Sequence, residues 1–389
     1  VGSAEPDGQI VQYSDDIMPI IITVDDVDST EVTVSADGLP AGIDLDATSC
    51  DELPCKLTLS GTAADQAGDY AATVTLNDGE DTSTVDVAIV IEPEDAFVQF
   101  HGGNPVAVQV AAAGEESPEF SLTFKLTERV PDLADGVPLP GDIALAEPDM
   151  VLVPVGSGSS ASPECAVTKI EGTGYGRELT YVCDFADVEV NTYVVEVNVD
   201  GGYYTAFAED VLVVYDPSLG FTTGAGEFYW PGTADPETGY PGDKTTFGYT
   251  MEYNKKGKNL KGSFVMIRHL PDGSIYKVKS NALYGLALGE FDVDGETYGW
   301  ASFSGKSTYL EPGWSDAIGN HDFIVYVEDR NDPGEGIDRV WIEMYDKDNE
   351  VITVMSMNDP AEDHAEDIED GQIVVPHGAG GDRKPPKNK

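Results

Sequence analysis

The stretch that decides the fold is residues 70–90, which read YAATVTLNDGEDTSTVDVAIV. On both sides of Asn77-Asp78-Gly79, a tripeptide typical of tight turns, apolar side chains alternate with polar ones. A period of two places alternate side chains on opposite faces of an extended strand. The stretch therefore predicts a β-hairpin that buries one face in a hydrophobic core.

The same alternation continues toward the N-terminus in short segments separated by turn residues. Pro19 stands at the mouth of the first segment, where a strand needs no ladder donor. No long segment carries a helical apolar stripe, so short strands bounded by turns favour a β-sandwich. The further strands predicted in this part of the chain are Ile20–Val24, Glu31–Val34 and Lys56–Leu59.

The turns of this part carry a family pattern. Residues 37–43 read DGLPAGI, residues 59–62 read LSGT and residues 67–79 read AGDYAATVTLNDG. Over most of residues 15–92 this order resembles the cadherin-like Ig repeat of bacterial surface proteins. It departs from the repeat at the Cys50–Cys55 loop and at Ala63, where the family usually has Pro. The resemblance implies an Ig-like domain in a secreted or cell-surface bacterial protein.

The rest of the chain predicts a second β-sandwich and a further β domain. Residues 192–201, TYVVEVNVDG, repeat the final-strand pattern of the first domain. The predicted domains are therefore an Ig-like sandwich over 1–94, a second one over 95–216, a β-rich domain over 217–378 and a basic tail over 379–389. The predicted strands of the second sandwich are Val106–Val110, Phe120–Leu126, Met150–Pro154, Leu179–Phe185, Tyr193–Val199 and Val211–Tyr215.

The third segment carries its own family pattern. Residues 220–228 read GFTTGAGEF, residues 341–349 read WIEMYDKDN and residues 371–375 read GQIVV. This order resembles the post-COAP domain at the C-terminal end of many secreted Ig-repeat proteins, with departures at Ala225 and at Glu227-Phe228. The resemblance implies a secreted β-rich module of no established catalytic activity. The predicted fold class is all-β: tandem Ig-like sandwiches with a C-terminal post-COAP-like domain.

The charge is strongly negative, with 72 acidic against 21 basic residues and a formal net charge of −51. Nucleic acid is excluded as a partner, because a phosphate backbone needs Lys and Arg to displace its counterions. Lys56 is the only basic residue before position 95. Self-repulsion of this size needs bound cations or salt to screen it, although a surface kept acidic for solubility is the simpler alternative. No apolar run approaches the roughly 20 residues that span a bilayer, so no membrane span is expected.

The four cysteines form two local pairs, Cys50 with Cys55 and Cys165 with Cys183. Four cysteines permit three connectivities, and this clustering favours the local one. A zinc site is the competing interpretation, but no histidine lies near either pair and no CxxC occurs. Two disulfides imply an oxidising compartment and hence an extracellular or cell-surface location.

Three acidic loops are candidate calcium sites, since Ca²⁺ prefers several closely spaced carboxylate and carbonyl oxygens. The loop over 328–338 ranks highest because its Gly and Pro would hold a concave backbone, and it resembles an acidic loop of the post-COAP family. None is an EF-hand, and a loop of this kind taken alone is more often a solvated acidic turn. The candidate ligands are Asp25, Asp26 and Asp28 in the first loop; Asp329, Asp332, Glu335 and Asp338 in the second; and Asp346 and Asp348 in the third.

Signatures of catalysis are missing from the sequence, which has neither GxSxG nor HExxH. We therefore expect a non-catalytic protein. The alternative is a carbohydrate-binding protein or an accessory segment of a secreted glycan hydrolase, because aromatic rings stack on sugars. Most aromatic residues should instead be core. The aromatic candidates for sugar contact are Tyr203, Tyr204, Trp230, Tyr298, Trp300 and Trp314.

These observations predict an extracellular structural or adhesive protein, a subunit or segment of a surface fibre, layer or adhesin with cation-stabilised β modules. Its expected partners are copies of itself or other surface proteins, with polysaccharide as a further possibility. Residues 8–13 alternate enough to pair with an open sheet edge of a neighbouring subunit. The basic tail, which ends RKPPKNK, is either disordered or in contact with an acidic neighbour.

Overall fold

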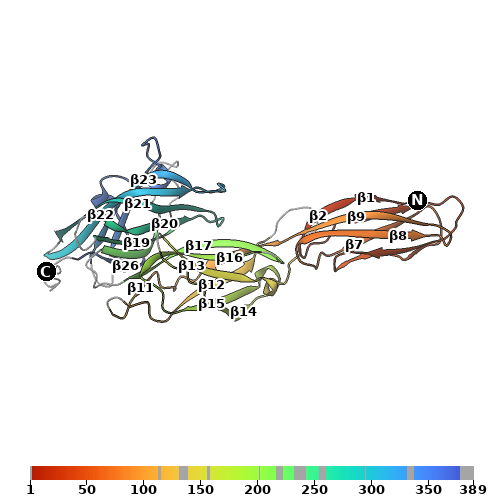
Figure 1. The fold of residues 1–389 in the computed structure, drawn as a ribbon, viewed down its shortest axis with the longest axis horizontal. Helices are drawn as coiled ribbons and strands as arrows, with labels where there is room; N and C mark the ends of the chain where they lie inside the picture. Colours follow the sequence, from red (N-terminus) through yellow and green to blue (C-terminus); the bar gives the residue numbers. More distant parts are fainter. Residues whose placement is uncertain are drawn as a thin grey trace.

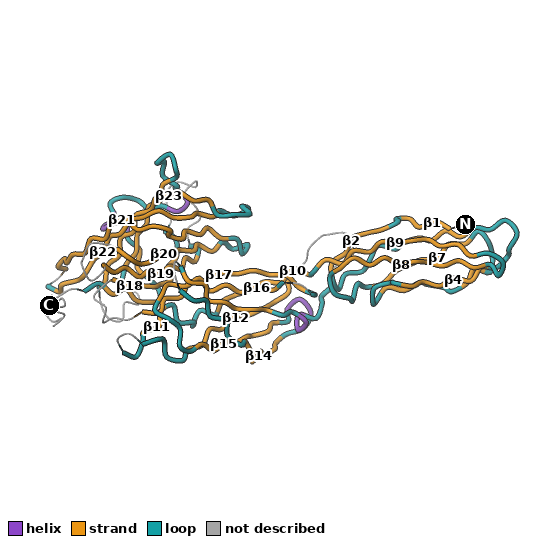
Figure 2. Tube along the Cα trace, viewed as in Figure 1, coloured by secondary structure: helices purple, strands orange, loops and turns teal. Residues whose placement is uncertain are grey.

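The chain folds into an elongated all-β molecule with a slender first domain at one end and a thicker body at the other (Figure 1). Strands supply nearly all of the regular structure (Figure 2), and among the residues that the structure describes the one α-helix is α1 (Ala361–His364). No helix in the described ranges is long and apolar enough to cross a bilayer. The computed structural model describes residues 2–112, 115–130, 139–155, 158–200, 202–215, 222–231, 242–253, 260–293, 295–330 and 337–376.

The first domain is a sandwich of a four-stranded sheet, β1-β3-β7-β5, and a five-stranded sheet, β2-β9-β8-β4-β6. The predicted hairpin is present as β8 and β9, paired from Gly68 with Ile91 to Asn77 with Thr82. The strands are β1 (Gly2–Glu5), β2 (Gly8–Gln12), β3 (Ile20–Val24), β4 (Val32–Asp37), β5 (Ile43–Leu45), β6 (Ser49–Cys50), β7 (Cys55–Gly61), β8 (Gly68–Asn77) and β9 (Thr82–Glu92).

Residues 8–13, expected to pair with an open sheet edge of a neighbouring subunit, pair with a strand of their own domain. Strand β2 runs parallel to β9, from Gly8 beside Ala88 to Gln12 beside Glu92. The apolar side chain of Val11 is buried in the core as a result. Because β2 is the edge strand of the five-stranded sheet, pairing of its other edge with a neighbouring subunit stays a prediction.

The second domain has the strand order β13-β16-β17-β10-β12-β15-β14, with β11 also on β17. Its first strand, β10, connects two groups of strands, because Glu94 and Asp95 pair with β17 whereas Ala96 to Phe100 pair with β12. Its elements are β10 (Glu94–Phe100), β11 (Ala107–Gln109), β12 (Phe120–Glu128), the 3-10 turn η1 (Ile143–Leu145), β13 (Pro148–Pro154), β14 (Cys165–Glu171), η2 (Gly174–Gly176), β15 (Glu178–Phe185), β16 (Asn191–Val199) and β17 (Tyr204–Tyr215).

The third domain is one nine-stranded sheet, β25-β24-β23-β22-β21-β20-β19-β18-β26. Its strands are β18 (Thr222–Tyr229), β19 (Lys244–Tyr253), β20 (Leu260–His269), β21 (Ile275–Val293), β22 (Glu296–Leu310), β23 (Ile318–Asp329), β24 (Arg339–Tyr345), β25 (Glu366–Asp367) and β26 (Asp370–Val374), with the turn η5 (Thr353–Met355) and α1 between β24 and β25. The two outermost strands, β25 and β26, are separated in sequence by Ile368 and Glu369 alone, so the sheet must curl until its edges meet.

The inside of this curl is filled mainly by aromatic and sulfur-containing side chains, which dominate a dense core. The outer face of β20 is also buried, because Val265 and Ile267 pack against Val194 and Val211 of the second domain. Residues 263–268 are consequently buried on both faces of the strand. Figure 1 shows the third domain stacked along the side of the second. Core residues inside the curl include Phe228, Phe247, Tyr249, Phe264, Phe303, Phe323 and Met344.

Both predicted disulfides are present, and they close local loops. Cys50 bonds to Cys55 in the first domain, and Cys165 bonds to Cys183 across the β14–β15 pair of the second. Among the residues that the structure describes there is no free cysteine. The local connectivity favoured by the sequence is therefore confirmed over a zinc site.

Candidate functional site

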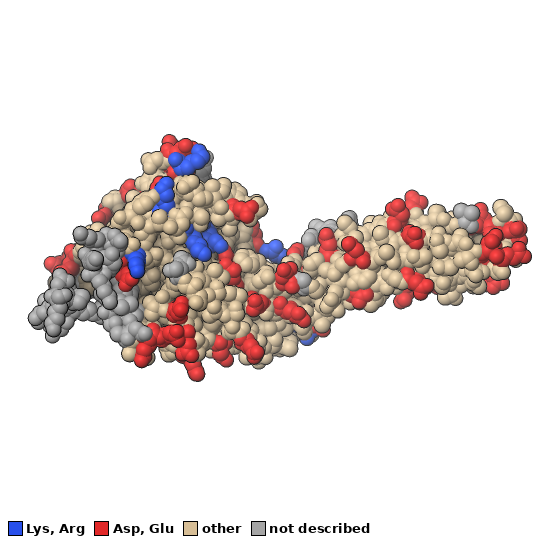
Figure 3. Space-filling view, in the orientation of Figure 1, with Lys and Arg blue, Asp and Glu red and all other residues tan. Residues whose placement is uncertain are grey.

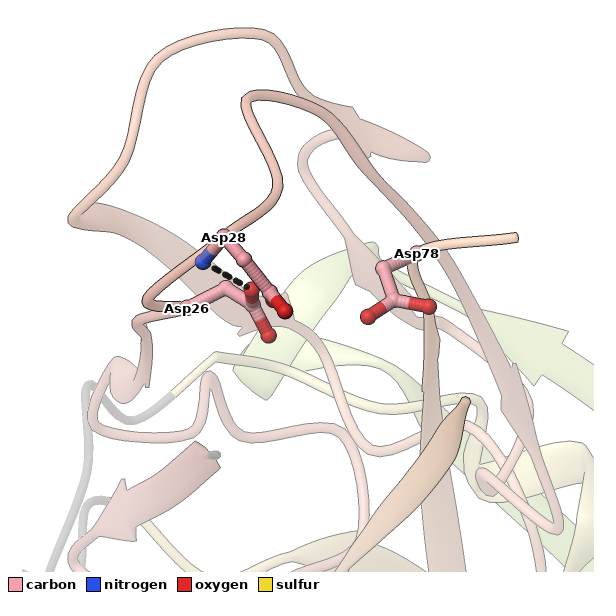
Figure 4. A group of neighbouring side chains, drawn as sticks. All are labelled: Asp26, Asp28 and Asp78. Carbon is pink, nitrogen blue, oxygen red and sulfur yellow. Dashed lines mark hydrogen bonds between the residues drawn. The ribbon is translucent and has the colours of Figure 1, made fainter. Parts of the chain in front are cut away.

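Three carboxylates converge at the free end of the first domain, here called the tip cluster: Asp26, Asp28 and Asp78 (Figure 4). Asp26 and Asp28 lie in the loop between β3 and β4, and Asp78 lies in the turn between β8 and β9. One oxygen of each lies within 4.8 Å of one oxygen of each of the others. Closely spaced carboxylate oxygens are the ligands that Ca²⁺ prefers, so the tip cluster is a candidate cation site.

Backbone amides hold two of these carboxylates in place. Asp26 Oδ1 accepts the N–H of Asp28 (3.1 Å) and of Ser29 (2.9 Å), and these bonds lower its pKa. Asp78 Oδ1 accepts the N–H of Asp81 (2.7 Å) and Glu80 (2.8 Å), which lowers its pKa in the same way. The pKa of Asp28 is raised, because its carboxyl shares a hydrogen bond with Asp26 and lies beside that charge.

The tip cluster differs from the predicted set by one residue. The structure brings Asp78 to Asp26 and Asp28, and it leaves Asp25 outside the group. The missing signal was topological: in a sandwich, the turn of the β8–β9 hairpin lies at the same end as the loop after β3. Figure 3 shows that this end is crowded with acidic side chains, and that the visible face of the first domain carries no Lys or Arg.

The second predicted loop is only partly described, since Asp332 and Glu335 lie outside the described residues. Its other two carboxylates, Asp329 and Asp338, are buried and bind backbone amides. Asp338 Oδ2 accepts the N–H of Ile373 (2.9 Å), and Asp329 Oδ2 accepts the N–H of Val375 (2.8 Å). These bonds fasten β26 and the residue after it to the β23–β24 connection across the seam of the curled sheet.

The third predicted loop is a tight turn after β24. Asp346 Oδ1 accepts the N–H of Asp348 (2.8 Å) and of Glu350 (2.9 Å), and the amide of Glu350 is the main cause of its lowered pKa. Asp348 forms an exposed ion pair with Lys347. Within the described ranges, the tip cluster is the group in which three potential ligands come together, so calcium at Asp346 and Asp348 stays a prediction.

A second set of carboxylates is buried where the first domain meets the second. Asp15 follows β2, Glu94 opens β10 and Glu128 ends β12, and none of the three is more than 5% exposed. Asp15 Oδ1 accepts the N–H of Leu139 (2.9 Å). Glu128 accepts the N–H of Gly141 (3.0 Å) and the hydroxyl of Tyr204 (3.2 Å). We call this set the joint carboxylates.

The charges of the joint carboxylates hinder the ionisation of Glu94 and Glu128. Burial, followed by the charges of Asp15 and Glu128, raises the pKa of Glu94 to about 8. Burial also raises the pKa of Glu128, and the charge of Asp15 adds to the shift. One oxygen of Glu94 is buried without a hydrogen-bond partner. At neutral pH Glu94 is therefore mostly protonated, and its ionisation would place a further charge inside the joint.

Aromatic rings complete this joint. The ring of Tyr13 makes edge contacts with Tyr203 and Tyr204, with ring centroids 4.8 and 5.7 Å apart.

The aromatic candidates for sugar contact differ in burial. Tyr204 and Trp230 are fully buried, so these two are core residues, as expected for most aromatics. Trp300 stacks on Tyr326 at 6.0 Å, Tyr298 lies 5.7 Å from Phe291, and Trp314 is 38% exposed.

Comparison with known proteins supports the Ig-like assignment. Residues 4–92 match the family model described as Putative Ig domain. No curated protein matches the chain. Similar solved structures include titin domains Z1Z2 in complex with telethonin (13% identity, 54% of this chain and 92% of that chain, TM-score 0.24), an I-band fragment of titin (7%, 83% and 91%, 0.22) and the D0-D1 domain of intimin (13%, 55% and 97%, 0.19).

TM-scores this low say nothing about function. The family match and the sheets together establish the fold. The first domain is an Ig-like domain, and the chain is an all-β protein of tandem Ig-like domains.

Proposed function

We propose that this chain is a non-catalytic extracellular protein with a structural or adhesive role, a segment or subunit of a bacterial surface fibre, layer or adhesin. The observation that carries the proposal is the arrangement of β domains in one elongated body (Figure 1), with the second and third domains joined by a buried apolar contact. Such a body holds whatever it carries at a fixed distance and orientation. The two disulfides support an oxidising compartment.

Two finer parts of the proposal concern the third domain and the tip cluster. The order of motifs in residues 217–378 supports a post-COAP-like domain, which fits a secreted protein. The tip cluster supports calcium as a stabilising ion of the first domain, bound by Asp26, Asp28 and Asp78. Other surface proteins or further copies of this chain are the proposed partners.

Surface labelling of intact source cells tests the location. An antibody to the first domain should stain unpermeabilised cells, and mild protease treatment of those cells should remove the protein. In the same fraction, all four cysteines should resist maleimide until a reductant is added. Recovery of the protein from the cytosol with reactive cysteines would overturn the proposal.

A further inference from the structure

A groove of about 850 Å³ lies between the second and third domains. One wall is formed by β10 and β17 of the second domain. The opposite wall is formed by the end of β18, the turn between β20 and β21, and the loop over 310–314 of the third domain. Ligand sites form preferentially at concave domain interfaces of this size, which makes the groove the first place to look for a ligand.

The two walls are held together by contacts that cross the interface. Lys277 Nζ of the third domain donates to both carboxylate oxygens of Glu209 in the second, at 2.5 and 2.7 Å. Arg129 Nη2 donates to the carbonyl of Asp272 (2.5 Å). The apolar contact that includes Val211 and Ile267 lies at the same interface. A ligand would therefore meet a groove that is already formed, without a cost for ordering its walls.

Three aromatic side chains of the lining are left exposed: Phe207 by 57%, Tyr229 by 51% and Trp314 by 38%. They come from β17, from β18 and from the loop before β23. Trp314 is steadied by an edge contact with Tyr309, with ring centroids 5.8 Å apart. Large apolar rings gathered in one concave surface mark a binding site. Flat exposed rings suit the apolar C–H face of a pyranose sugar.

The charges of the groove favour an uncharged ligand. Each cation of the lining already has an acceptor, since Lys244 pairs with Glu227 (2.7 Å), Lys277 with Glu209 and Arg129 with a carbonyl. Burial lowers the pKa of His269, so its ring is neutral at pH 7. The two lysines are thus paired with carboxylates, and Arg129 is bonded to an uncharged carbonyl, so the described lining offers a sulfate, phosphate or uronate at most one guanidinium, beside the carboxylates of Asp95 and Asp210. The net charge of −51 repels anionic polymers further.

We propose that this groove binds a neutral oligosaccharide or polysaccharide. The rings of Phe207, Tyr229 and Trp314 stack on sugar faces, and the carboxylates of Asp95 and Asp210, which also line the groove, accept hydrogen bonds from sugar hydroxyls. This binding activity goes beyond the structural role and does not depend on it, because a rod can serve as a spacer whether or not its groove is occupied.

The test is native gel electrophoresis of the full chain in gels that contain a soluble neutral polysaccharide: a mixed-linkage β-glucan, xylan, glucomannan or dextran. The acidic protein should be retarded by at least one of them, and titration with the matching hexasaccharide should change tryptophan fluorescence. Trp314 is the reporter, because Trp230 and Trp341 are buried and Trp300, which is partly exposed, does not line the groove. Trp314→Phe should remove most of the fluorescence change while calorimetry still detects binding.

Trp314→Ala and Tyr229→Ala should each weaken binding by at least tenfold. Both side chains are exposed, so thermal melts should show an unchanged fold. Tyr284→Ala is the matched control, because Tyr284 is 58% exposed on β21 but lies outside the groove. Retardation by none of the four neutral polysaccharides, stronger retardation by alginate or dextran sulfate, or equal loss in Tyr284→Ala would each overturn the proposal.

Discussion

The two contacts between successive domains differ in chemistry: the first is polar and contains carboxylates, and the second is mainly apolar. Between the first and second domains, Pro93 is the whole link from β9 to β10, and the contact holds tyrosines and three buried carboxylates. Between the second and third, valine and isoleucine side chains meet, with the Lys277–Glu209 ion pair beside them. An apolar contact keeps its strength at any pH, whereas clustered acids change charge with pH. The strength of the contact between the second and third domains should therefore be independent of pH, whereas the strength of the contact between the first and second should change with pH.

The largest effect is expected from breaking the second joint. Ile267→Ala removes a fully buried side chain from the contact between the two domains, so it should lower the free energy of unfolding by about 2–4 kcal/mol. Urea unfolding followed by far-UV circular dichroism measures the change. Ile318→Ala is the control, since Ile318 is half exposed on β23 and should cost no more than about 0.5 kcal/mol. Equal losses in the two variants would show that the apolar contact does not hold the domains together.

The first joint should respond to pH through Glu94. Its pKa in the folded protein, about 8, lies above its ordinary value of 4.5, so the native state binds the proton more tightly than the unfolded state. The stabilising effect of the neutral group is complete below about pH 4.5 and is lost as pH rises through 8. Glu94→Gln cannot ionise, and it should exceed the parent in stability by about 3–4 kcal/mol at pH 9 and by less than about 1 kcal/mol at pH 5.

Thermal melts of both proteins across this pH range test the expectation. Glu92→Gln serves as the matched control, because Glu92 stands just before Pro93 with an exposed side chain. If Glu94→Gln raises the stability by the same amount at pH 5 and pH 9, the ionisation of Glu94 does not destabilise the contact between the first and second domains.

Calcium at the tip should give the smallest effect. Exposed sites in extracellular modules bind Ca²⁺ with dissociation constants of about 10⁻⁴–10⁻³ M. Ten millimolar Ca²⁺ should then stabilise the first domain by about 1–3 kcal/mol. Asp78→Asn should abolish the gain, and Asp25→Asn, outside the tip cluster, should keep it.

Calorimetry in EDTA, in CaCl₂ and in molar NaCl with EDTA separates binding from screening. Only the first-domain transition should move with calcium, because the tip cluster lies at the free end of that domain, away from the second domain. An equal rise in NaCl without calcium would instead assign the acidity to general screening and leave the site without support.

Local pattern predicted the fold well, because period-two alternation is a property of consecutive residues. Ile20–Val24 is a strand with the predicted bounds, and the predicted hairpin is β8–β9. The pattern failed where long-range contacts decide. Nothing in the polar run Glu92-Pro93-Glu94 indicates that Glu94 opens β10. Nothing in the run Gly305-Lys306-Ser307 indicates that Ser307 is buried in β22, where strands lie on both sides of it.

The candidate sites were harder to predict, since 72 acidic residues offer no local sign of which are buried. Asp329 and Asp338 belong to the loop ranked highest for calcium, but the seam of the curled sheet uses their oxygens for backbone amides. Asp15, Glu94 and Glu128 are distant in sequence, and only the meeting of two domains brings them together. Partners of this kind follow from topology and not from spacing.

The seam of the third domain also has a consequence for solubility. Ile373 and Val375 are two residues apart, so their N–H groups leave β26 on the same side, away from β18. On an open strand those groups would be a template for another chain and a starting point for aggregation. Asp338 and Asp329 occupy them with carboxylate oxygens instead. The outer edge of β26 is thereby closed to the addition of another strand at these two residues.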